Sequence, residues 1–339
     1  MNRILRKIGV LLTISFAVVN LFAKEAIFDS EDYSLYVEYN DTSAPGDAVF
    51  VRMKITQNNR KAKISKEQFR ATTAKLTLKN PDKTLRKSDF YEIPAVSSRS
   101  RQEITLLAGI PLSSWWTPES QPNLTLTITY NLYGENSYHF DLPFSLIGKE
   151  FVSETLYLNE SNTSIKTDNS DKRMQQINKL NALLGTFNPD AVYQTKPFVS
   201  PTTVERRTSF FADRRIYQYT SGHSSTGLHY GIDFGAPQGS EVTACAAGKV
   251  VMAETRISTG WSIVIEHLPG LYSLYYHLSE MKVKVGDMVE EGQLIGLSGN
   301  TGLSTAPHLH WEMRLNGEAV SPDFFKGNFT FEDLPENKE

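Results

Sequence analysis

The chain has 339 residues, of which 40% are hydrophobic and 22% are charged. These values are typical of globular proteins, so they exclude a wholly disordered or fibrous chain, and the length suggests about two domains. Lys and Arg number 35 against 38 Asp and Glu, a net charge of -3, which does not indicate nucleic acid as a partner. Cys245 is the single cysteine. It excludes an internal disulfide and a multi-cysteine metal site, so any metal must be held by His, Asp or Glu.

Residues 1–23 are predicted to be a secretory signal peptide. Basic residues in the first seven positions are followed by an apolar run over 8–23, which ends on the small residue Ala23. The run is shorter than the ~20 residues that comfortably span a bilayer. An uncleaved anchor is the alternative, and only this alternative would attach the chain to a membrane. In both cases the rest of the chain is expected to be exported.

Residues 24–150 are predicted to form a β-sandwich that acts as an accessory domain. Short runs in which apolar and polar residues alternate, such as 33–39 and 124–130, are separated by turn signals such as Pro45-Gly46. Several short runs with a period of two indicate antiparallel strands that each bury one face. We find no cluster of chemically reactive residues in this region.

Residues 151–208 are expected to be a linker that contains one short helix. The stretch 159–170 is polar and rich in Asn, Ser and Thr, which predicts a loop. Beyond it, apolar residues recur every three positions: Met174, Ile177, Leu180 and Leu183. This spacing predicts an amphipathic helix that is capped by Ser170 or Asp171 and ended by Gly185.

Residues 209–329 are predicted to form a second β domain with many glycine-containing turns, followed by an acidic tail over 330–339. Six of the seven histidines lie between residues 223 and 310: His223, His229, His267, His277, His308 and His310. Their clustering suggests a functional site, and their spacing says more.

His308 and His310 are two residues apart in a run that continues as Trp311-Glu312-Met313-Arg314. In a strand, residues i and i+2 point to the same face, so both imidazoles would face one site. For this spacing alone, two unrelated surface histidines are the alternative.

His229 and Asp233 are four residues apart, and Gly231 between them permits close backbone approach. The glycines around this motif favour a loop that enters a strand. With one of His308 and His310, the motif offers three N/O ligands and an open fourth position, which is the pattern of catalytic zinc. The same ligands also suit other divalent ions, such as iron or manganese.

His277 ends an apolar, strand-like run, Tyr275-Tyr276-His277-Leu278. Together with whichever of His308 and His310 does not bind the metal, it would supply two imidazoles that are not ligands. Two such groups suffice for general-base and transition-state roles beside a metal-activated water.

In their order along the chain, these three motifs resemble the signature of the lysostaphin-like zinc metalloendopeptidases. That signature combines His-x-x-x-Asp, Tyr-x-His-Leu and His-x-His, which are matched here by 229–233, 275–278 and 308–310. One departure is Ala306, where the family commonly has glycine. The resemblance covers 211–325, about one third of the chain.

The resemblance implies a compact antiparallel β-core that binds one Zn2+ ion through His229, Asp233 and His310, with His277 and His308 as catalytic histidines. It implies an exported endopeptidase, in the periplasm or cell envelope of a bacterium, that hydrolyses peptide bonds by means of a metal-activated water. Its partners would be peptides of bacterial peptidoglycan, either cross-links or stem peptides. The sequence indicates no oligomeric state.

Two other functions are compatible with parts of the sequence. A catalytically inactive relative could bind the cell wall or activate another hydrolase, but such relatives typically lose ligands, and this chain keeps all five positions. A lipoyl-type carrier domain is suggested by the turns at Gly286-Asp287 and Gly292. Carriers need an exposed lysine at a hairpin tip, and they have no use for a histidine cluster. The carrier is therefore less well supported by the sequence than the inactive relative.

Other basic residues receive simpler interpretations. His223 is expected to be exposed to solvent, with substrate contact as the alternative. His267, which precedes Leu268-Pro269-Gly270, is expected to be a turn residue. A basic cluster precedes the first motif and consists of Arg206, Arg207, Arg214 and Arg215. It is expected to be part of a solvated linker, with contact to wall carboxylates as the alternative.

Overall fold

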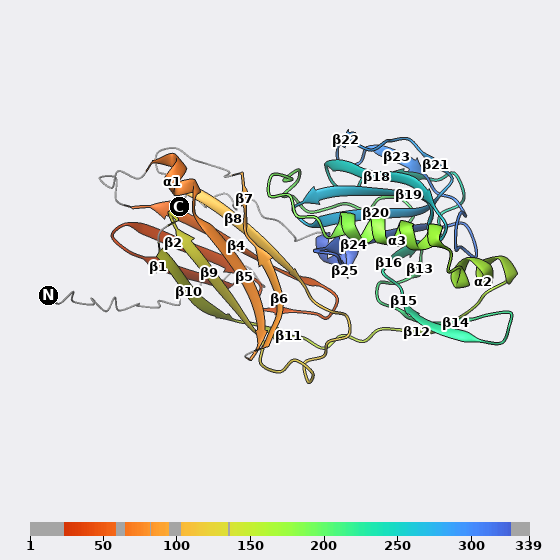
Figure 1. Ribbon diagram of the computed structural model, residues 1–339, viewed down its shortest axis with the longest axis horizontal. Coiled ribbons are helices and arrows are strands. Elements are labelled where there is room, and N and C mark those ends of the chain that lie inside the picture. The colour runs from red at the N-terminus through yellow and green to blue at the C-terminus, as the bar shows by residue number, and fades with distance from the viewer. Residues whose placement is uncertain (1–23, 59–64, 82, 95–102, 135, 327–339) are drawn as a thin grey trace.

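The computed structural model describes residues 24–58, 65–81, 83–94, 103–134 and 136–326. The expected signal peptide and the expected acidic tail lie outside the described residues. The structure is mainly β, as the sequence predicts, and consists of a two-sheet sandwich and a second β unit (Figure 1). Among the described residues, no helix combines the length and the apolarity that crossing a bilayer requires.

The N-terminal unit is a sandwich of two antiparallel sheets. In spatial order, one sheet contains β1 (Lys24–Asp29), β2 (Tyr33–Tyr39), β4 (Ala48–Gln57), β8 (Glu103–Pro111) and β7 (Tyr91–Ile93). The other contains β10 (Asn136–Pro143), β9 (Thr125–Leu132), β5 (Thr73–Asn80) and β6 (Lys83–Asp89). The smaller elements are β3 (Thr42–Ser43), which pairs with β11 (Ser145–Leu146), and α1 (Lys66–Arg70). Alternate side chains such as Leu35 and Leu76 are fully buried between the sheets, as the period of two predicts.

The segment expected to be a linker is more ordered than the sequence predicts. It contains β12 (Ser153–Tyr157), α2 (Glu160–Thr167) and α3 (Asp171–Leu184). Helix α3 is the predicted amphipathic helix, and the cap is Ser170, whose side chain accepts a hydrogen bond from the backbone N–H of Arg173.

The prediction of a loop over 159–170 is wrong. Helix α2 begins in this stretch because the Asn159 side chain accepts a hydrogen bond from the backbone N–H of Asn162 and so caps the first turn. A run of Asn, Ser and Thr therefore starts a helix here, where composition alone favours a loop.

The C-terminal unit is built around an eight-stranded sheet. Its strands, in spatial order, are β13 (Arg207–Ser209), β16 (Gly231–Phe234), β24 (Leu309–Leu315), β20 (Leu271–Leu278), β19 (Gly260–Leu268), β18 (Gly248–Arg256) and β22 (Met288–Val289), with β25 (Glu318–Val320) paired to β24. A small sheet contains β17 (Glu241–Thr243), β23 (Leu294–Leu297) and β21 (Glu280–Met281), and another contains β12, β14 (Arg214–Gln218) and β15 (Ser224–Leu228). A 3-10 helix, η1 (Pro322–Phe325), follows β25.

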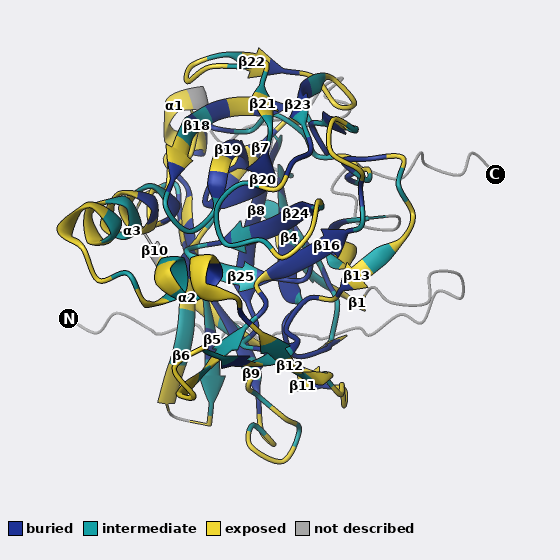
Figure 2. Ribbon diagram, turned by 90° about the vertical axis from the view of Figure 1, so that its right-hand side faces the viewer, coloured by how far each residue is buried: buried dark blue, intermediate teal, exposed yellow. Residues whose placement is uncertain are grey.

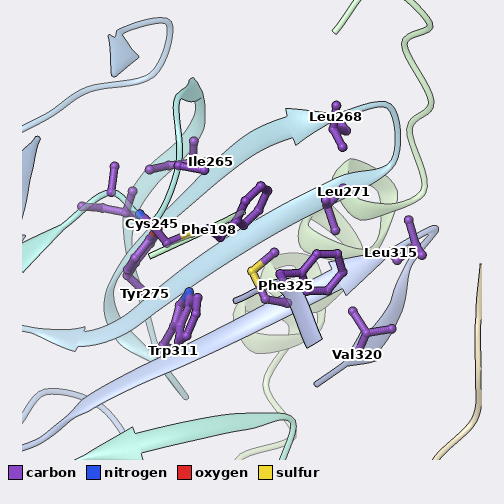
Figure 3. Close-up of a cluster of buried hydrophobic side chains, with 14 of the residues drawn as sticks. Phe198, Cys245, Ile265, Leu268, Leu271, Tyr275, Trp311, Leu315, Val320 and Phe325 are labelled. Atoms are coloured by element: carbon purple, nitrogen blue, oxygen red, sulfur yellow. The ribbon is translucent and has the colours of Figure 1, made fainter. Parts of the chain in front are cut away.

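One face of the large sheet carries the apolar core. The side chains that Figure 3 shows packed together include Phe198, Cys245, Tyr275, Trp311 and Phe325. Because Trp311 of β24 points into this core, its neighbours His310 and Glu312 point to the opposite face of the sheet. Figure 2 shows that β16, β20 and β24 are buried along most of their length, whereas α2 and α3 are exposed on one side.

The sandwich packs directly against the C-terminal unit. Phe50 of β4 lies with its ring centroid 6.3 Å from that of Phe324 and 6.2 Å from that of Phe325. The backbone N–H of Ser321 donates to the carbonyl oxygen of Gly46 over 2.7 Å. The two units therefore share one continuous apolar cluster instead of being joined by the linker alone.

The prediction that His267 is a turn residue is wrong, because the turn begins only after Leu268. His267 is fully buried in β19. Its Nδ1 lies 2.8 Å from the carbonyl oxygen of Ala247, and its Nε2 lies 2.7 Å from the hydroxyl of Ser273. A carbonyl only accepts, so Nδ1 carries the proton and the ring is held neutral.

This burial predicts a pH-dependent loss of stability. Burial lowers the pKa of His267 to about 4, against about 6.5 in the unfolded chain. Between these values the unfolded chain binds the proton and the folded chain does not, so stability is full above pH 6.5 and falls as the pH falls towards 4. The expected loss is about 2 kcal/mol by pH 5. Urea unfolding at pH 7 and pH 5 measures it, and H267N, which cannot take up this proton, should lose less than the wild type. An equal loss in both proteins would contradict this assignment.

Candidate metal centre

The antiparallel pairing of β16 with β24 creates the centre. Asp233 lies directly opposite His310 in this pair, and both point to the face of the sheet away from the core. His229 precedes β16 by two residues. Gly231 lies between them at a point of close approach, because a Cβ atom there would lie only 2.2 Å from the carbonyl oxygen of Trp311. Only glycine allows this close approach of β16 to β24.

Three donor atoms converge at this point. The distances are 3.1 Å from His229 Nε2 to Asp233 Oδ1, 3.0 Å from His229 Nε2 to His310 Nδ1, and 2.9 Å from His310 Nδ1 to Asp233 Oδ1. All three side chains are buried, and they form the one group in the described part of the chain whose His, Cys, Asp or Glu ligand atoms are close enough to share a metal ion. The spacing argument left open which histidine of the 308–310 pair joins them. The structure places His310 in the group, with His308 Nε2 3.7 Å from Asp233 Oδ1.

The donor set fits a zinc ion. His229 Nδ1 lies 2.8 Å from the carbonyl oxygen of Phe210, so it carries the proton and the lone pair of Nε2 faces the site. His310 Nε2 lies 3.6 Å from a carboxylate oxygen of Glu312, which leaves Nδ1 for the site. Zinc bonds of about 2.0–2.2 Å place tetrahedral ligand atoms about 3.3 Å apart, close to the observed spacing. Supporting contacts of this kind usually orient histidine ligands of metals.

The electrostatics of the group also favour a cation. Burial alone would raise the pKa of Asp233, but the imidazoles of His229 and His310 hold it well below its usual range. Burial lowers the pKa of His310, yet the hydrogen bond with Asp233 and the negative charges of Asp233 and Glu312 outweigh it and raise that pKa to about 9. The site therefore attracts a proton to His310 when nothing else is bound. A divalent cation would replace this proton, because metal ligands bind in their deprotonated form.

His277 lies beside the three donor atoms in a strained conformation. Its backbone φ is 61°, in the left-handed region that a bulky residue rarely adopts. Its Nδ1 lies 2.7 Å from the carbonyl oxygen of Thr301, and its backbone N–H donates to Thr259 over 2.9 Å. Strain of this kind costs about 1–3 kcal/mol and is typical of functional sites.

His308 is the second imidazole beside the group, and its ring centroid is 4.7 Å from that of His277. Its Nδ1 lies 2.8 Å from the carbonyl oxygen of Ala306 and 3.1 Å from the hydroxyl of Ser304. Burial lowers the pKa of His308, so the ring is neutral near pH 7. The carbonyl oxygen of Ser304 accepts a hydrogen bond from Asn162 of α2 over 3.0 Å. Helix α2 therefore supports the loop that contains Ser304 and precedes His308.

Sequence reasoning missed two charged pairs at the centre. Arg215, expected in a solvated cluster, is largely buried and contacts Asp233 Oδ2 over 3.2 Å and Glu154 Oε1 over 2.8 Å. Arg314 pairs with Glu312, which lies next to His310. The second pair had a signal in the sequence, because Glu312 and Arg314 continue the i, i+2 spacing of His308 and His310. The first pair had none, since Glu154 is 61 residues away from Arg215.

Two other arginines of the basic cluster, Arg207 and Arg214, also have partners within the protein. Arg207 forms a bidentate pair with Asp323, with distances of 2.6 and 2.7 Å. Arg214 lies 3.9 Å from the ring centroid of Trp115 in the sandwich. His223 is exposed, as the sequence predicts.

Comparison with known families agrees with this geometry. The family model for "Peptidase family M23" matches residues 227–322, which contain all five histidine and aspartate positions. The C-terminal third of the chain is an M23 peptidase domain. This confirms the resemblance to lysostaphin-like peptidases that the three motifs indicate.

Proteins similar to the M23 domain include a lysostaphin and a peptidoglycan DD-endopeptidase. Lysostaphin of Staphylococcus simulans is 45% identical over 98 residues, which cover 26% of this chain and 19% of that protein. The peptidoglycan DD-endopeptidase ShyA of Vibrio cholerae is 32% identical over 176 residues, which cover 52% of this chain and 40% of that protein. The chain thus matches less than half the length of these relatives.

The structural likeness to a known protein extends beyond the M23 domain. A crystal structure described as an M23 peptidase from Pseudomonas aeruginosa aligns with 76% of this chain and 89% of that chain, with a TM-score of 0.51 and 19% sequence identity. At this identity the likeness shows the fold alone.

The centre predicts that metal binding depends on Asp233. Substitution D233A removes the anionic ligand and leaves two imidazoles, so we expect the wild type to retain one equivalent of zinc through dialysis and the variant to retain none. Inductively coupled plasma mass spectrometry of the purified proteins measures this. The exposed residue Asp171 provides a control, since D171A should keep its zinc. Full zinc content in D233A would contradict the site.

Proposed function

We propose that this chain is an exported zinc-dependent endopeptidase that hydrolyses peptide bonds in peptidoglycan, in cross-links or stem peptides, in the periplasm or cell envelope of a bacterium. The observation that carries the proposal is the convergence of His229, Asp233 and His310 beside the two neutral imidazoles of His277 and His308. The similarity to a protein named peptidoglycan DD-endopeptidase supports the substrate class. Export would depend on residues 1–23.

In this proposal His229, Asp233 and His310 would hold one Zn2+ ion. Three protein ligands with an open position are typical of catalytic zinc. When bound, the ion supplies Lewis acidity, which makes water a competent nucleophile near neutral pH. Its two positive charges exceed the one negative charge of Asp233, so the centre favours the negative charge that develops on a peptide carbonyl under attack.

His308 is proposed to be the general base. Its Nδ1 faces the carbonyl oxygen of Ala306, which only accepts, so Nδ1 carries the proton and Nε2 presents a lone pair on the side of Asp233. Because burial lowers its pKa, His308 enters the reaction in the form that can accept a proton. It takes the proton of the attacking water at Nε2 and then delivers it to the leaving amine.

His277 is proposed to assist at the oxyanion. Burial lowers its pKa to about 3, and the carbonyl oxygen of Thr301 fixes its proton on Nδ1, so Nε2 is at first an acceptor. His277 therefore orients the water by accepting a hydrogen bond. If it then takes the second proton of the attacking water, which the negative charge of the oxyanion favours, it can donate to that oxyanion, and this proton also leaves with the amine.

Digestion of purified peptidoglycan tests the function. The full chain should release new amino termini and shorter peptides, which mass spectrometry of the products identifies, and a chelator should abolish the release until zinc is restored. A chain that binds zinc and peptidoglycan but releases nothing would indicate the alternative function, an inactive wall-binding or hydrolase-activating relative.

Substitution H308A tests the general base. The variant keeps all three ligands, so it should retain zinc while its turnover falls by ~10²-fold or more. The rate of product release per zinc-loaded protein is the measurement. Near-normal turnover in H308A would show that another group takes the proton.

Substitution H277N tests the second imidazole without changing the backbone requirement. Asparagine tolerates a positive φ better than most residues, and its amide can donate to Thr301 as His277 does. We therefore expect an unchanged melting temperature and a loss of turnover of ~10²-fold or more, since the proton-accepting nitrogen is gone. Equal activity of H277N and wild type would assign His277 a purely structural role.

A further inference from the structure

We propose that Arg215 and Glu154 are positioning residues of the metal centre, with Arg215 fixing the carboxylate of Asp233 and Glu154 fixing Arg215. Both residues precede the segment 227–322 that matches the M23 family. The inference rests on the proposed function, because it concerns how the zinc ligand Asp233 is held.

The two oxygen atoms of Asp233 have different partners. Oδ1 faces His229 Nε2 and His310 Nδ1, whereas Oδ2 lies 3.2 Å from a terminal guanidinium nitrogen of Arg215. With Oδ2 held by Arg215, Oδ1 is the oxygen presented to the metal, and the carboxylate cannot rotate to offer both. Arg215 thus selects a single-oxygen bond. Groups that orient metal ligands in this way typically affect metal affinity or activity by about 10–100-fold.

Arg215 itself needs a second carboxylate. Its side chain is only 12% exposed, and burying a guanidinium is costly unless it is fully paired. Glu154 supplies the partner, with Oε1 2.8 Å from Arg215 Nε. The planar guanidinium can serve both carboxylates at once because its Nε and terminal nitrogens point in fixed directions. A lysine ammonium in the same place keeps the charge but lacks this fixed geometry.

The pairing of β12 with β14 determines the position of Glu154 relative to Arg215. Strand β12 runs parallel to β14, and the register places Glu154 beside Arg215. Two residues further along β14, Tyr217 is buried on the same face, and Lys166 of α2 lies 3.8 Å from its ring centroid. The segment 153–167 therefore contacts both Arg215 and its neighbour Tyr217 on this face of β14. The expected linker thus contributes to the site and is more than a spacer.

The test measures zinc affinity of the full chain by competition with a chromophoric chelator. In R215K the positive charge stays and the geometry is lost, so the dissociation constant for zinc should rise by about 10–100-fold. Glu154 is partly exposed, so E154A should fold normally and change the affinity in the same direction, by less. Because Glu154 acts through Arg215, the double variant R215K/E154A should bind zinc no more weakly than R215K.

The control is R207K, which breaks a similar arginine–carboxylate pair, with Asp323, that includes no metal ligand. Its zinc affinity should equal that of the wild type. A second readout is the visible absorption of the cobalt-substituted protein, which reports ligand geometry and should change in R215K and E154A but not in R207K.

Unchanged zinc affinity and an unchanged cobalt spectrum in both R215K and E154A would overturn the inference, as would an equal loss in R207K. These outcomes are separate from the failure of the proposed function. If the wild type binds zinc and digests peptidoglycan while the variants match it, only the positioning role falls; if the wild type binds no zinc, both proposals fall.

Discussion

The register between β16 and β24 is the constraint on which the centre depends. It sets Asp233 opposite His310 and Ile232 opposite Trp311. A slip of one residue would turn His310 into the core and Trp311 out of it, because successive side chains point to opposite faces. Trp311 is fully buried among Phe198, Tyr275 and Phe325, so a slip would expose a large apolar surface. The packing of the core on one face of the sheet thereby determines the position of the proposed metal ligands on the other.

Charge is the second constraint, because the centre gathers several ionisable groups with little access to water. Buried charges are tolerated when each has a partner and costly when one is removed. Asp233 is shared by two imidazoles and Arg215, and Glu312 is shared by His310 and Arg314. This pairing keeps the ligand carboxylate ionised without bound metal. It also keeps the site assembled for a cation to enter.

The sequence predicted the parts of the molecule in which the spacing of residues along one strand or helix determines the direction of their side chains. The period of two gave the sandwich and the common face of His308 and His310, and the period near three gave α3. The prediction failed where the environment of a residue depends on contacts with residues far away in the sequence. His267 lies buried in a strand, where Ala247 and Ser273 bind its ring, and Arg215 is buried with Glu154 and Asp233 as its partners. None of these partners is identifiable without the fold. Helix α2 was also missed, because it begins at a single cap by Asn159 and its composition is typical of a loop.

Strand β14 connects the sandwich to the metal centre, because adjacent residues on a strand point in opposite directions. Arg214 donates to the carbonyl oxygen of Ser114 over 2.7 Å and lies over Trp115, both in the sandwich. Arg215, the next residue, contacts Asp233 on the other side. The same short strand therefore contacts both the sandwich and the proposed metal ligand Asp233. A division of the chain into an accessory domain, a linker and a catalytic domain describes its sequence, but Arg215, which contacts Asp233, is itself paired with Glu154 of the expected linker.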